Sequence, residues 1–155
     1  MFAAEEILDM AIRIEKNGEA AYRNAIENIS NPALISLLEW MADEEVKHAK
    51  WFLELKEEVA TPAKSPFVQE VGREFINGVL GEQSFSLKDV DFSQIDRIND
   101  LIDIFIEFEE DGILFYEMLQ PFIQHKDKLA QLDEIIAEEK RHIEQLRKFK
   151  ESETP

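Results

Sequence analysis

Residues of the kinds that bind metal ions recur in this chain as two similar sets, 94 positions apart. Each set contains a Glu, a Gly three residues later, a Tyr seven residues later, a second Glu 30 residues after the first, and a His three residues after that. The two sets are Glu15, Gly18, Tyr22, Glu45 and His48, and Glu109, Gly112, Tyr116, Glu139 and His142. Carboxylates and imidazoles are donors that divalent metal ions accept. The repeat therefore predicts a site for two metal ions.

The spacing inside each set allows its donors to reach a common point. Residues three positions apart lie on one face of a helix, so each Glu-x-x-His pair can aim a carboxylate and an imidazole at the same metal. The two earlier glutamates, Glu15 and Glu109, then approach from two other helices. Four carboxylates carry four negative charges, which balance two divalent cations, and paired metal ions of this kind lie roughly 3.5–4 Å apart.

The alternative to a metal site is a buried network of acids. Burying an unpaired charge costs several kcal/mol, and carboxylates that face one another repel unless they are protonated or bind a metal. A proton-sharing network, with His48 and His142 as structural side chains, is the other interpretation of the same residues. The matching register of the two sets favours metal binding.

Amphipathic helices are predicted to carry these residues, and the first two form the pair 2–59. Apolar or small side chains recur at steps of three and four over 4–29 and again over 34–59, which is the period of a helix face. Between the two stripes, Asn31 can cap a new helix and Pro32 suits its first turn. The turn is short, so the two helices are predicted to be antiparallel neighbours.

The second helix pair, 94–150, follows a long connection and repeats this pattern, with its first stripe beginning at Ile95. The connection, 61–93, is long enough to return the chain along the whole bundle, so the third helix is predicted to run parallel to the second. An amphipathic segment at 67–79 is predicted to cap the bundle or to pack on another subunit. The sequence therefore predicts one all-α domain over 1–155, a four-helix bundle with a long crossover between helices two and three.

Composition limits the function classes. The net charge is −17, with 34 acidic and 17 basic residues and no basic cluster interleaved with aromatics, so nucleic acid is not an expected partner. The chain has no cysteine, so a second redox centre of the rubredoxin or iron–sulfur type must lie on another molecule. No stretch approaches the length of a membrane span and the N-terminus lacks a basic region, so we expect a cytoplasmic protein with no membrane partner.

Two segments carry a resemblance to a known family. Residues 11–18, Ala-Ile-Arg-Ile-Glu-Lys-Asn-Gly, and 40–48, Trp-Met-Ala-Asp-Glu-Glu-Val-Lys-His, are similar to signatures of the rubrerythrin-like branch of the ferritin-like di-iron carboxylate superfamily. The resemblance implies a ferritin-like bundle with two iron ions, bridged by Glu45 and Glu139. The metal ligands that it implies are Glu15, Glu45, His48, Glu109, Glu139 and His142. Manganese and zinc accept the same donors.

The resemblance also implies a function, that of a peroxidase-like di-iron oxidoreductase active against oxidative stress. Two ferrous ions would supply one electron each to hydrogen peroxide or dioxygen, and an external electron-donor protein would restore them. One alternative is a ferroxidase, or an iron storage or delivery protein without redox turnover. A further alternative is a partner-binding or scaffold bundle whose metals serve stability.

Two departures from the family pattern bear on this function. Rubrerythrins have an additional Glu one turn after the third-helix ligand, associated with redox-linked ligand switching, and Gly112 stands at that position here. They also usually carry a four-Cys rubredoxin domain, which this chain lacks. In addition, Val46 replaces the Met of haem-binding bacterioferritins, so haem is not implied.

Several neighbours of the predicted ligands have candidate roles. Tyr22 and Tyr116 lie two turns after Glu ligands and point to the same side, where they can hydrogen-bond ligand carboxylates, quench radicals, or simply pack in the core. Glu44 and Glu138 can orient the His ligands through their second nitrogens, or remain surface acids.

The remaining notable side chains are predicted to have no chemical role. His125 is predicted to be an exposed loop residue, and Trp40 and Trp51 to be packing residues. The sequence shows no obvious fifth helix of the kind that helps ferritin shells to close, so we expect a homodimer rather than a cage.

Overall fold

The structure, a computed structural model, describes residues 4–60 and 97–153. Within these ranges, all regular structure is helical, which confirms the predicted all-α class. The elements are α1 (Ala4–Ile26), α2 (Pro32–Val59), α4 (Ile98–Leu119), the short 3-10 helix η3 (Gln120–Phe122) and α5 (Lys126–Glu153). The predicted crossover, 61–93, its amphipathic segment and Ile95 lie outside the described residues.

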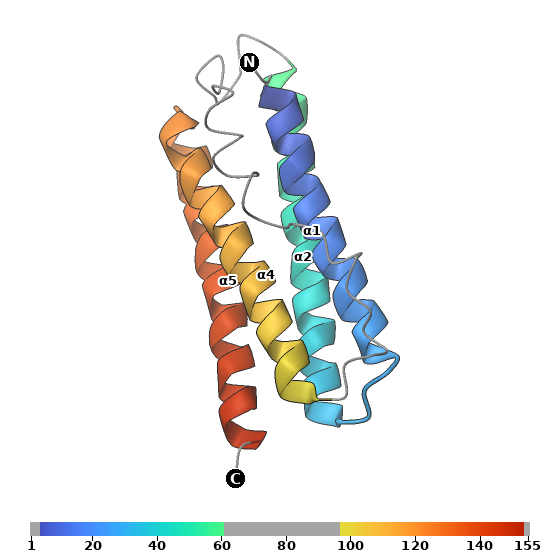
Figure 1. The fold of residues 1–155 in the computed structure, drawn as a ribbon. Helices are drawn as coiled ribbons and strands as arrows, with labels where there is room; N and C mark the ends of the chain where they lie inside the picture. Colours follow the sequence, from blue (N-terminus) through green and yellow to red (C-terminus); the bar gives the residue numbers. More distant parts are fainter. Residues whose placement is uncertain (1–3, 61–96, 154–155) are drawn as a thin grey trace.

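The four α-helices form a bundle of two antiparallel pairs (Figure 1). Helix α1 packs along α2, and α4 packs along α5, with further contacts of α1 to α4 and of α2 to α5. Helix α4 runs in the same direction as α2, as predicted from the length of the connection between them (Figure 1). None of the helices in 4–60 and 97–153 is both long and apolar enough to cross a membrane.

Helix α1 ends at Ile26, three residues before the end of the predicted stripe at Ile29. The backbone N–H of Asn28 donates to the carbonyl of Ala25 over 3.0 Å, which tightens the chain into a turn. The Asn28 side chain also donates to the carbonyl of Asn24 over 3.3 Å. These bonds satisfy carbonyls at the helix end, so the helix stops while Ile29 still packs partly buried against the core.

Helix α2 begins at the residues that the sequence singled out. The Asn31 side chain accepts hydrogen bonds from the backbone N–H groups of Ala33 (3.0 Å) and Leu34 (3.3 Å), and Pro32 occupies the first turn.

We predict that Asn31→Ala lowers the free energy of unfolding by about 1 kcal/mol, because both N–H groups lose their acceptor. Urea denaturation followed by circular dichroism measures this. Exposed Asn28→Ala is the comparison and should cost less; equal losses would contradict a specific capping role.

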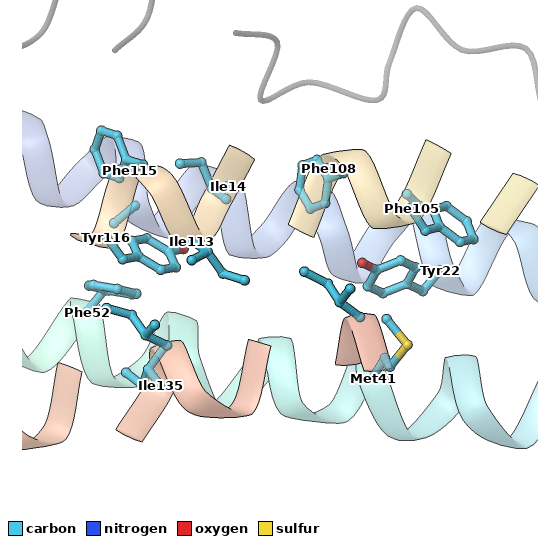
Figure 2. Close-up of a cluster of buried hydrophobic side chains, with 14 of the residues drawn as sticks. Ile14, Tyr22, Met41, Phe52, Phe105, Phe108, Ile113, Phe115, Tyr116 and Ile135 are labelled. Carbon is cyan, nitrogen blue, oxygen red and sulfur yellow. The ribbon is translucent and has the colours of Figure 1, made fainter. Parts of the chain in front are cut away.

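The interior is apolar along nearly the whole bundle. The predicted inward positions of α1, α2, α4 and α5 are buried, apart from partly buried ones towards the helix ends. Aromatic side chains form two groups along the bundle axis (Figure 2). In one, Tyr22 packs edge-on against Phe105 with ring centroids 4.8 Å apart, and in the other Phe52 lies 5.0 Å from Tyr116. Aromatic side chains are accordingly the largest fully buried ones: Tyr22, Tyr116, Phe52, Phe105 and Phe115.

Candidate metal centre

The six predicted metal ligands lie together inside the bundle, and none is more than 3% exposed. Glu15 comes from α1 and Glu109 from α4, while α2 and α5 each supply a Glu and a His one turn apart. Two groups of four residues have donor atoms that all lie within 4.8 Å of one another. The group called here the His48 position is Glu15, Glu45, His48 and Glu139, and the group called the His142 position is Glu45, Glu109, Glu139 and His142.

Glu45 and Glu139 belong to both positions. A carboxylate has two oxygens, so one that lies between two metal ions can bind each ion through a different oxygen. Glu45 and Glu139 are therefore the two residues common to both groups, and the bridging role that the resemblance implies for them stays a prediction. Glu15 and Glu109 each belong to one position only.

Several donor atoms of this cluster are buried without a hydrogen-bond partner in the described part of the chain. These atoms are Glu15 Oε2, Glu45 Oε1, Glu139 Oε2, and both Nδ1 and Nε2 of His142. Buried polar atoms are almost always hydrogen-bonded, and exceptions call for an unseen ion or water. Apart from His142 Nε2, these atoms belong to residues whose donors gather in the two groups of four, and they form a donor set that a pair of cations would complete. The residues present therefore fit a di-metal site.

Two of the carboxyl groups favour the protonated state. Burial, together with the charges of Glu109, Glu139 and Glu15, raises the pKa of Glu45 well above its usual value. Burial and the neighbouring Glu139 raise the pKa of Glu109 to about 8. The metal-free cluster therefore favours protons on these two acids, which reduces the repulsion among its carboxylates.

Three other groups of the cluster, Glu139, His48 and His142, have pKa values shifted towards their charged forms. Burial opposes ionisation of Glu139, but its close contacts with Glu109 and the two imidazoles leave its pKa below the usual value. Burial alone lowers the pKa of an imidazole, yet the carboxylates Glu139 and Glu15 outweigh this and raise the pKa of His48 to about 12. In the same way Glu109 and Glu139 raise the pKa of His142 to about 10. Protons thus occupy the metal-free site where cations would bind.

The two tyrosines donate hydrogen bonds to Glu109 and Glu15, the two glutamates that each belong to one metal position only. Such bonds were among the roles predicted for the tyrosines. The Tyr22 hydroxyl donates to Glu109 Oε1, and the Tyr116 hydroxyl donates to Glu15 Oε1 over 2.7 Å. Each tyrosine therefore holds the carboxylate of the other half of the repeat. Burial, followed by the charge of the bonded carboxylate, raises the pKa of both phenols well above the usual value, so both remain donors.

Glu44 and Glu138, which precede the two shared glutamates, occupy equivalent positions in the repeat but are not placed symmetrically around the site. Glu138 Oε2 lies 2.5 Å from Nε2 of His48, across the bundle from its own helix. Glu44 lies on the same side, because oxygens of Glu44 and Glu138 and a nitrogen of His48 are all within 4.8 Å of one another. His142 Nε2 receives no such carboxylate from the described residues.

Trp40 was predicted from the sequence to be a packing residue, and its position beside the candidate site was not anticipated. Its ring lies edge-on to the ring of His142, with centroids 5.0 Å apart, and the residue is 41% exposed. The other tryptophan, Trp51, packs against Phe52 and donates its indole N–H to Gln131 over 2.8 Å. His125 is exposed, as predicted.

The two repeated glycines differ in the space around them. A Cβ atom on Gly18 would lie 3.0 Å from Cε1 of Phe108 and 3.3 Å from Oε2 of Glu45, whereas one on Gly112 would meet, among the described residues, Cγ2 of Ile14 at 3.7 Å. We predict that Gly18→Ala displaces Glu45 and weakens metal binding, while Gly112→Ala leaves binding unchanged and stabilises the helix by up to about 1 kcal/mol. Calorimetric metal titration and thermal unfolding of both variants test this. Equal effects of the two substitutions would contradict it.

Comparison with known proteins agrees with this geometry. The sequence profile of the family described as Rubrerythrin matches residues 6–150. The chain belongs to the rubrerythrin family. A crystal structure described as that of a ferritin-like diiron-carboxylate protein from Thermotoga maritima matches 99% of this chain and 97% of its own, with 25% sequence identity and a TM-score of 0.79. No curated protein sequence matches the chain. This rubrerythrin-family chain therefore has the ferritin-like fold, and its buried Glu and His cluster fits the di-iron site of such proteins.

Proposed function

We propose that this chain binds two iron ions and reduces hydrogen peroxide or dioxygen with electrons from an external donor protein. The observation that carries the proposal is the overlap of the His48 and His142 positions, which share Glu45 and Glu139 inside an enclosed bundle. A pair of ions held by common carboxylates can deliver two electrons together. Two ferrous ions held there would each supply one electron, and with two protons these would convert hydrogen peroxide to two waters.

The residues around the site support this chemistry by holding the donors and limiting water. Tyr116 fixes one oxygen of Glu15, and Tyr22 fixes one oxygen of Glu109, which leaves the second oxygen of each carboxylate for a metal. These two tyrosines belong to the two aromatic groups along the bundle axis (Figure 2), and the candidate ligands are themselves no more than 3% exposed. A dry site strengthens the interaction between carboxylates and cations.

The electrons must come from another molecule in this proposal. The chain has no cysteine, and so offers no rubredoxin-type centre of its own. Its net charge of −17 favours a donor protein that presents a basic face, because complementary charge speeds encounter. The proposed donor is therefore a separate protein with a basic face.

A second candidate function is iron oxidation for storage or delivery. Gly112 favours it, because the extra glutamate that the family associates with redox-linked ligand switching is absent. The same donor set also accepts manganese or zinc. The two functions differ in which oxidant reacts quickly and in whether more than two ions are taken up per chain.

The test is anaerobic loading with ferrous iron, followed by stopped-flow absorbance after addition of stoichiometric hydrogen peroxide or dioxygen. Fast oxidation of two irons by peroxide, slow reaction with dioxygen and full recovery after re-reduction support the reductase. Rapid oxidation by dioxygen, followed by uptake of further iron, supports iron handling. Failure to bind two metal ions would contradict both proposed functions. The Glu45→Gln variant, which lacks a shared carboxylate, serves as the control for oxidation of loosely bound iron.

A further inference from the structure

The two imidazoles of the site are held differently, although they occupy equivalent places in the repeat. His48 uses both nitrogens: Nδ1 lies 2.8 Å from Glu139 Oε1, and Nε2 lies 2.5 Å from Glu138 Oε2. When Nδ1 binds a metal, Nε2 carries the proton and Glu138 can accept it in a hydrogen bond. Such a partner fixes the ring and makes the metal-binding nitrogen a better donor.

His142 lacks an equivalent partner among the described residues. Its Nδ1 faces the cluster, 3.2 Å from Glu139 and 3.3 Å from Glu45, but its Nε2 is buried with no hydrogen-bond partner. The ring of Trp40 lies edge-on to the ring of His142, with centroids 5.0 Å apart. An aromatic ring restrains the imidazole but accepts a hydrogen bond only weakly.

The repeat explains how this difference arises. Glu44 is the counterpart of Glu138 at the offset of 94, so a symmetric site would direct Glu44 to His142. Instead, both carboxylates lie beside His48: Glu138 Oε2 is 2.5 Å from its Nε2, and an oxygen of Glu44 lies within 4.8 Å of a ring nitrogen. The counterpart of Trp40 is the exposed Glu134, so the bulky ring is present only beside His142. One side of the site is acidic and the other is aromatic.

The added negative charge favours a cation on the His48 side. Side chains of Glu44 and Glu138 are 16% and 23% exposed, so their charges are only partly screened. Lys47 lies 4.0 Å from Glu44, and Arg141 lies 3.9 Å from Glu138. These basic side chains are 75% and 59% exposed, so solvent screens their charges. Exposed pairs at this distance interact weakly.

From this asymmetry we propose that the two metal positions are unequal: the His48 position fills first and holds its ion more tightly, and Glu138 is the positioning residue responsible. The inference rests on the proposed metal binding. Loss of an outer hydrogen-bond partner typically costs roughly 10–100-fold in metal affinity, so we expect the two positions to differ by about this factor. The His142 position is consequently the one that releases its ion first.

The three histidines of the chain make a direct test possible, because selective ¹⁵N-His labelling gives one set of ring signals for each of His48, His125 and His142. Zn²⁺ serves as a diamagnetic probe in the NMR titration. We expect the His48 signals to reach the bound state near one equivalent, and the His142 signals only near two. Exposed His125 reports nonspecific binding. Simultaneous shifts, or earlier shifts of His142, overturn the inference while leaving two-metal binding intact.

Two charge-matched variants isolate the role of Glu138. Glu138→Gln should weaken the His48 position by about 10–100-fold, bring the two titration steps together, and move the His48 Nε2 signal of the zinc-loaded protein. Glu134→Gln removes an exposed acid one turn earlier on α5 and should change neither. Unaltered filling order in Glu138→Gln would overturn the assignment to this residue. Absence of any histidine shift with zinc overturns the proposed metal site as well, and so is distinguishable from failure of the inference alone.

Discussion

Glu45→Gln is expected to abolish tight binding of both metal ions, whereas Glu109→Gln is expected to remove only one. Glu45 contributes a donor to both the His48 and the His142 position, while Glu109 contributes to the His142 position alone. Glutamine has nearly the shape of glutamate but supplies a neutral amide, so each substitution removes a ligand charge with little change in packing. The affinity lost should exceed the roughly 10–100-fold that an outer hydrogen-bond partner contributes.

Loss of folding is not expected to explain this result. Burial raises the pKa of Glu45 well above its usual value and that of Glu109 to about 8, so the metal-free fold favours the neutral form of both side chains. A neutral amide at either position resembles that form. The metal-free variants should therefore unfold at temperatures equal to or above that of the unmodified chain.

The measurement is the number of Co²⁺ ions per chain after gel filtration, determined by elemental analysis, together with calorimetric titration. Glu107→Gln, an exposed acid on α4, is the matched control and should retain both ions. Circular dichroism of the metal-free variants establishes that they fold. A Glu45→Gln variant that keeps one tightly bound ion would show that the two positions do not depend on a common carboxylate.

The metal-binding cluster could be anticipated from sequence because its geometry is mostly local. The i, i+3 spacing of Glu and His fixes their common face before any helix is packed, and the repeat then supplies two further glutamates in register. Turn chemistry at Asn31 similarly fixes the start of α2. What these predictions share is that the interactions concerned lie within one or two turns of a helix.

The arrangement of the outer residues could not be anticipated, because it depends on contacts between helices. Glu44 and Glu138 are equivalent in the repeat, yet both lie beside His48. The partner of each tyrosine likewise depends on how α1 and α4 pack, since Tyr22 reaches Glu109 on the other helix. Trp40 became relevant only when the fold placed it against His142. Rotation of a helix by a fraction of a turn would change each of these contacts.

Raising the pH is expected to destabilise the metal-free protein and to strengthen metal binding. The folded-state pKa of Glu109 is raised from 4.5 to about 8, so its contribution to stability is fully present below about 4.5 and is lost as the pH rises through about 8. The imidazole of His142 acts in the same direction: its pKa rises from 6.5 to about 10, and the stability it contributes is lost as the pH rises through about 10. Glu15, whose pKa is lowered, acts only at the acidic end, below its usual value of 4.5.

Thermal unfolding in the presence of a chelator measures the first effect, and the midpoint should fall between about pH 5 and about pH 9. Glu109→Gln should flatten this fall around pH 8, because the amide cannot ionise, and Glu107→Gln should not. A metal ion must displace the protons held by Glu45, Glu109, His48 and His142, so binding should release protons and become tighter as the pH rises. Calorimetry in two buffers of different ionisation enthalpy counts those protons. A midpoint that rises with pH in the metal-free protein, or metal binding without proton release, would contradict a site in which protons take the place of the metal ions.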